Sequence, residues 1–65
     1  MNIYKITWEY DEELNFIAVV VSISEEAAMK KLNINNNVAS NINVSMLGQA
    51  VNEITEPRVV CLEAI

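Results

Sequence analysis

The side chains of this sequence that could do chemistry are nine carboxylates and one thiol, and their spacing matches no catalytic set. No histidine is present, so no imidazole can activate a serine or Cys61 as a nucleophile. The densest acidic group lacks the Asp-x-Asp-x-Asp-Gly loop of a calcium site, and one thiol cannot supply the ligands of structural zinc. We therefore expect a non-enzymatic protein with no catalytic residue, no metal site and no cofactor.

The acidic group and the aromatic residues beside it allow two interpretations. The carboxylates are typical of a solvated hairpin tip, and the alternative is a contact surface for a basic partner. Trp8 and its neighbouring tyrosines can pack under a helix, or they can anchor an interface. Cys61, between Val60 and Leu62, is typical of a small buried hydrophobic residue. The candidate partner-binding residues are Trp8, Glu9, Tyr10, Asp11, Glu12 and Glu13.

Composition excludes several classes of partner. The net charge is −5, and the four basic residues are scattered, which disfavours binding to nucleic acid through phosphates. The longest apolar run, Phe16 to Val21, is far shorter than the roughly 20 residues of a membrane-spanning helix. The N-terminus has no signal-peptide pattern. We expect a cytoplasmic protein.

The first half of the chain predicts two paired strands. Asn2 to Tyr10 alternates between an aromatic side, with Tyr4, Ile6 and Trp8, and a mostly polar side. The stretch from Asp11 to Asn15 is charged and has the length of a hairpin loop. The second strand, Phe16 to Ile23, is apolar on both sides, so we expect both of its faces to be covered.

A helix is predicted next, from Glu25 to about Asn33. Ser24 can cap its first turn, and Ile23 can form a hydrophobic staple with Ala28. The asparagines that follow terminate helices, and the stretch to Asn41 is typical of a loop.

The last part of the chain predicts two further strands. Alternation from Ile42 to Leu47 indicates the third, with a bulge or bend near Gly48, the only glycine in the chain. An irregular connection from Ala50 to Pro57 leads to the fourth strand, from Arg58 to Glu63. Residues 1–65 thus predict one α+β domain, a four-stranded, mainly antiparallel β-β-α-β-β sheet with one helix packed on one face.

This fold leaves apolar surface that a single helix cannot cover. Of the 65 residues, 52% are hydrophobic, and a chain this short buries only about 60% of the surface that its unfolded form exposes. Neither a disulfide nor structural zinc is available to add stability. We therefore expect a twofold homodimer formed through a sheet face or a sheet edge.

Several segments together resemble the small β-β-α-β-β accessory proteins that bacteriophages encode. They are the strand containing Tyr4-Lys5-Ile6-Thr7, the acidic hairpin, Phe16 to Val21, the helix start Ser24-Glu25-Glu26-Ala27-Ala28, the turn Leu47-Gly48-Gln49-Ala50 and the closing Val59-Val60. The resemblance implies a protein that binds a host bacterial protein and inhibits anti-phage defence, of the Hachiman type or a similar one.

Two alternative functions remain open at this stage. One is a sponge for a small molecule or nucleotide, with its site between subunits. Binding of a phosphate-rich ligand requires basic residues or a glycine-rich loop, and this sequence has few of either. The other is a structural oligomerisation module.

Overall fold

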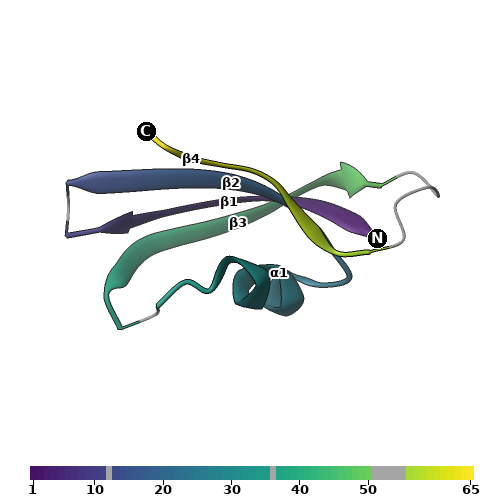
Figure 1. Ribbon diagram of the computed structural model, residues 1–65, viewed down its shortest axis with the longest axis horizontal. Coiled ribbons are helices and arrows are strands. Elements are labelled where there is room, and N and C mark those ends of the chain that lie inside the picture. Colours follow the sequence, from purple (N-terminus) through teal and green to yellow (C-terminus); the bar gives the residue numbers. More distant parts are fainter. Residues whose placement is uncertain (12, 36, 51–55) are drawn as a thin grey trace.

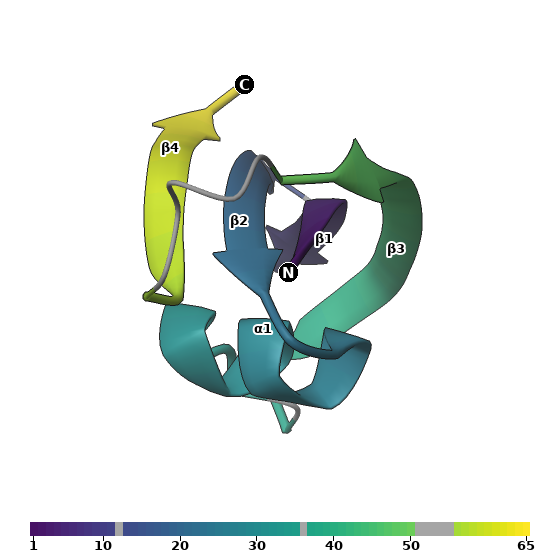
Figure 2. The ribbon, with the colours of Figure 1, turned by 90° about the vertical axis from the view of Figure 1, so that its right-hand side faces the viewer.

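The computed structural model describes residues 1–11, 13–35, 37–50 and 56–65. Four strands form one sheet in the order β3-β1-β2-β4, all neighbours pair antiparallel, and one helix follows β2 (Figure 1). Figure 2 shows the strands side by side with the helix below them. This arrangement confirms the predicted β-β-α-β-β fold. The elements are β1 (Asn2–Tyr10), β2 (Leu14–Ser22), α1 (Glu25–Leu32), β3 (Ala39–Gln49) and β4 (Arg58–Ala64).

Strand β1 lies in the middle of the sheet and supplies three of the six residues of the buried core cluster. Its alternation places Tyr4, Ile6 and Trp8 on the face toward α1, which we call the helix face, and all three side chains are buried. Lys5 lies exposed on the opposite side, which we call the far face. The predicted bounds and buried side of this strand are confirmed because a period-2 pattern fixes both.

The hairpin between β1 and β2 is tighter than predicted. Tyr10 pairs with Leu14, so three residues form the loop and β2 begins two residues before Phe16. Asp11 adopts a left-handed conformation with φ of 54°. The charged stretch predicts a longer loop, but Leu14 and Asn15 extend the ladder instead. Glu12 lies outside the described residues.

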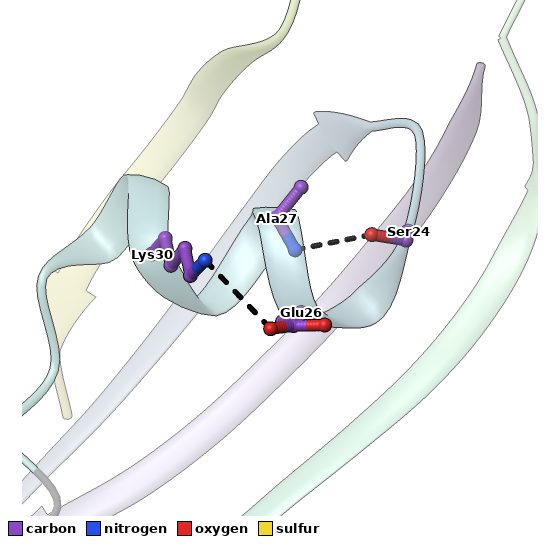
Figure 3. Close-up of polar contacts among 4 residues, drawn as sticks. All are labelled: Ser24, Glu26, Ala27 and Lys30. Carbon is purple, nitrogen blue, oxygen red and sulfur yellow. Dashed lines mark hydrogen bonds and ion pairs between the residues drawn. The ribbon is translucent and has the colours of Figure 1, made fainter.

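The helix starts and ends as its sequence predicts. Ser24 is the N-cap, and its Oγ accepts a hydrogen bond from the Ala27 N–H at 3.1 Å (Figure 3). Asn33 closes the helix in a left-handed conformation, with φ of 56°, and its N–H donates to the Lys30 carbonyl. Glu26 and Lys30 form an i,i+4 ion pair at 3.7 Å, also visible in Figure 3.

The buried stripe of α1 faces the sheet. Ala28 is fully buried, and Met29 and Leu32 pack against the core. The predicted hydrophobic staple is wrong, because Ile23 is 69% exposed. Glu26 and Lys30 are also largely exposed, so solvent screens their ion pair and we assign it little stability.

Strand β3 begins at Ala39, three residues before the predicted start, and it contains two bulges. Leu47 is the extra residue between the pairs formed by Met46 and Gly48, so the predicted bulge next to Gly48 is confirmed. The second bulge places Asn41 and Ile42 opposite Trp8 alone. Asn41 is left-handed there, with φ of 51°, so the end of the stretch that predicts a loop instead supplies a bulge.

The distribution of exposure differs from the prediction on the far face. On β2, Val21 is only 1% exposed, and Ile17 and Val19 are half-buried. All seven residues of β4 are exposed, Cys61 included, so the prediction of a buried cysteine is wrong. Most of the predicted connection before β4, residues 51–55, lies outside the described residues.

Candidate functional site

Carboxylates gather at the end of the sheet that holds the β1–β2 turn. Asp11 and Glu13 are exposed in the turn, and Glu9 is half-buried just before it. Strand β4 ends nearby, since the Ile65 N–H donates to the Asn15 carbonyl at 2.7 Å, and Figure 1 shows this terminus near the turn. Glu63 in β4 lies opposite Ile17. We call this region the acidic end and define it by Glu9, Asp11, Glu13 and Glu63.

The acidic end contains four of the six predicted site residues. Glu9, Asp11 and Glu13 belong to it directly, and Tyr10 is half-buried between Glu9 and Asp11. Trp8 is only 6% exposed, so it lies in the core and not on the surface. Glu12, the sixth candidate, lies outside the described residues.

Glu9 is held in place by the bulge of β3. The Asn41 side-chain amide donates to Glu9 Oε1, and the Asn43 side-chain amide in turn donates to the Asn41 carbonyl at 3.1 Å. The left-handed backbone of Asn41 presents its amide to Glu9. The sequence does not predict Asn41 as a site residue, because the stretch that ends at Asn41 is typical of a loop.

The three aromatic rings near this end are packed against each other. The Trp8 and Phe16 rings stack with centroids 5.6 Å apart and planes 17° apart. Tyr10 meets Phe16 edge to face, also at 5.6 Å. Such pairs stabilise a core beyond the area that they bury. The packed rings therefore stabilise the part of β1 and β2 that adjoins the acidic end.

A hollow of about 220 Å³ lies beside Glu9. Its volume is below the roughly 300 Å³ at which ligand pockets usually begin, so it suits a single side chain better than a whole ligand. Its lining combines polar and apolar groups, namely Thr7, Trp8, Glu9, Asn15, Phe16, Asn41 and Ile65.

Two further findings concern the described ranges only. No cluster of three or more His, Cys, Asp or Glu side chains there could hold a metal ion. No helix in the same ranges has both the length and the apolar character needed to cross a membrane.

Comparison with known proteins adds no relative to these observations. No family model matches the chain, and neither a curated protein nor a solved structure matches it.

Proposed function

We propose that this protein is a non-enzymatic protein-binding module that acts as a homodimer and uses its acidic end to bind a basic surface of a partner protein. The observation that carries the proposal is the grouping of Glu9, Asp11, Glu13 and Glu63 at one end of the sheet. Three of these carboxylates are exposed.

The charges at the acidic end are not neutralised by neighbouring basic groups. Among the described residues the one ion pair is between Glu26 and Lys30, on the helix. Arg58 stands opposite Val21, whereas the acidic end flanks the other end of β2. A patch of one sign speeds encounter with a partner of the opposite sign and selects against acidic proteins.

The hollow beside Glu9 supports the same proposal. A lysine or arginine side chain of the partner would place its charged group near the Glu9 carboxylate and its methylenes against the apolar lining. Lysine and arginine can bury their methylene stems along an apolar surface while the charged group stays close to water and to the carboxylate. Occlusion of the partner's surface would then be the mechanism of inhibition.

The identity of the partner rests on the resemblance to phage accessory proteins alone. On that basis we propose a host bacterial protein, and specifically a component of an anti-phage defence system of the Hachiman type or a similar one.

Affinity capture from a bacterial host lysate tests the proposal. The tagged chain should recover one host protein in stoichiometric amount, as identified by mass spectrometry. The double variant Asp11→Lys with Glu13→Lys should then bind that protein at least tenfold more weakly, about 1.4 kcal/mol in binding free energy. The affinity of the original chain should fall as salt is raised.

The matched control carries the same charge change elsewhere. Glu25 and Glu56 are exposed and lie outside the acidic end, so Glu25→Lys with Glu56→Lys should retain the original affinity. Equal weakening by both double variants would reduce the effect to net charge and contradict a site at the acidic end. Failure to recover any stoichiometric protein would contradict the binding function.

A further inference from the structure

Strands β3 and β4 form the two edges of the sheet, and they differ in how well they are protected. Edge strands expose unpaired backbone N–H and C=O groups, and bulges and polar side chains protect them. Strand β3 has two bulges, and many of its exposed residues are polar. Strand β4 has one bulge, and four of its seven residues are Val, Cys or Leu. The less protected edge is therefore β4.

The open edge of β4 has donors and acceptors available for another strand. The Ile65 N–H points to β2, where it donates to Asn15. Because directions alternate along an antiparallel strand, Leu62 and Ala64 direct their N–H and C=O groups away from β2. Leu62 is also 53% exposed and Val60 is 59% exposed, so apolar side chains accompany these backbone groups.

The side chains of β4 are arranged so that the strand complements itself. Arg58, Cys61 and Glu63 lie opposite Val21, Val19 and Ile17, which places all three on the far face. Val59 and Leu62 lie opposite Val20 and Ala18, on the helix face. A twofold axis at Cys61 therefore brings Arg58 next to Glu63 of the second copy, and Leu62 next to its valines.

We infer that β4 pairs antiparallel with β4 of a second copy of this chain, about a twofold axis at Cys61, to give one continuous sheet through both subunits. The inference rests on the homodimer part of the proposed function and identifies its surface. Twofold pairing places each Glu63 beside an Arg58, buries the exposed Val and Leu side chains, and leaves Glu9, Asp11 and Glu13 at the acidic end of each subunit free.

Charge exchange tests this register. Arg58→Glu places two carboxylates together at both ends of the paired strands, and Glu63→Arg places two guanidinium groups together there. Each single variant should weaken the dimer by roughly tenfold or more, since two favourable cross-strand charge pairs become two unfavourable ones. The double variant should return to within about threefold of the original dissociation constant, as measured by analytical ultracentrifugation.

Cysteine cross-linking provides an independent test. Directly opposed residues in an antiparallel pair have Cα atoms about 4.5 to 5.5 Å apart, which a disulfide can bridge. Mild oxidation of the dilute protein should therefore link two chains through Cys61. The control is Ser45→Cys in a Cys61→Ser background, because Ser45 is exposed on the same face but in β3. That variant should cross-link slowly, as collision alone allows.

The outcomes separate this inference from the proposed function. A dimer that both single variants leave intact, or a double variant that does not recover, would overturn β4 pairing while the homodimer stands. Cross-linking of the Ser45→Cys control as fast as that of the original chain would overturn it as well. A monomer at every concentration would overturn the homodimer and the β4 pairing together, whereas binding at the acidic end is judged separately by the capture experiment.

Discussion

Asparagine and aspartate take the left-handed backbone positions that glycine usually occupies. Asp11 in the hairpin turn, Asn33 at the helix C-cap and Asn41 in the β3 bulge all have positive φ, and none of them is glycine. The single glycine of the chain has no positive φ. Asn and Asp tolerate this conformation better than other residues with a Cβ. The asparagine-rich composition is thus partly explained by turn, cap and bulge geometry.

Replacement of Asn33 by alanine should lower the free energy of unfolding by about 1 kcal/mol, because alanine is strained in a left-handed conformation. Asn33→Gly should remain within about 0.5 kcal/mol of the original chain. Lys31→Ala is the control, since Lys31 is exposed within α1. Urea unfolding at fixed protein concentration, followed by the fluorescence of Trp8, measures all three. Equal loss in Asn33→Ala and Asn33→Gly would contradict a backbone origin.

Ser22 is a buried polar residue whose hydroxyl we expect to destabilise the fold. Its Oγ is fully buried and has no hydrogen-bond partner in the described part of the chain. Ser22→Ala removes a buried hydroxyl whose unsatisfied hydrogen bonding costs about 1 kcal/mol or more in folding free energy, and the side-chain volume stays nearly the same. The free energy of unfolding should stay unchanged or rise by up to about 1 kcal/mol. A clear fall would mean that the hydroxyl is satisfied in solution.

At the scale of elements, local patterns predicted β1 and α1 well. The alternation in β1 and the Ser24 cap of α1 are written into neighbouring residues, and both are confirmed. The sequence predicts the starts of β2 and β3 too late. Leu14 and Asn15 belong to the charged stretch that is typical of a hairpin loop, and Ala39 belongs to the stretch before Asn41 that is typical of a loop. Their pairing with β1 is a tertiary effect that overrides local preference.

The candidate site was predictable to a similar extent. Glu9, Asp11 and Glu13 lie within five consecutive residues, so they could be found from the sequence alone. Glu63 and Asn41 could not, since β4 and β3 bring them close only through the sheet. The choice between core and surface for Trp8 also needed the position of the helix.

Removal of the N-cap tests how far α1 depends on its first turn. Ser24→Ala should lower the free energy of unfolding by about 1 kcal/mol, since the Ala27 N–H loses its acceptor. In a domain of this size such a loss shifts Tm by roughly 4 to 8 °C. Ser24→Asp keeps an acceptor at the cap and should lose much less. Thermal unfolding followed by circular dichroism distinguishes the two, and equal losses would contradict the capping role.

At the scale of the whole molecule, strand order decides where apolar surface remains. The sequence predicts that the far face of β2 needs a partner, yet within one chain Val21 on that face is already buried, and Ile17 and Val19 are half-buried. The unmet need lies at the edge instead, where every residue of β4 is exposed. Strand order is a property of the complete sheet, so periodicity within single strands could not supply it.

Amide hydrogen exchange at Leu62 tests most directly whether a second copy covers the edge of β4. The Leu62 N–H points away from β2, whereas alternation directs the N–H groups of Cys61 and Glu63 toward β2. As the protein concentration rises through the dissociation constant of the dimer, exchange of the Leu62 N–H should slow by at least tenfold. At saturation it should be as well protected as the Glu63 N–H. Rapid exchange at Leu62 at every concentration, with Glu63 protected throughout, would contradict the account.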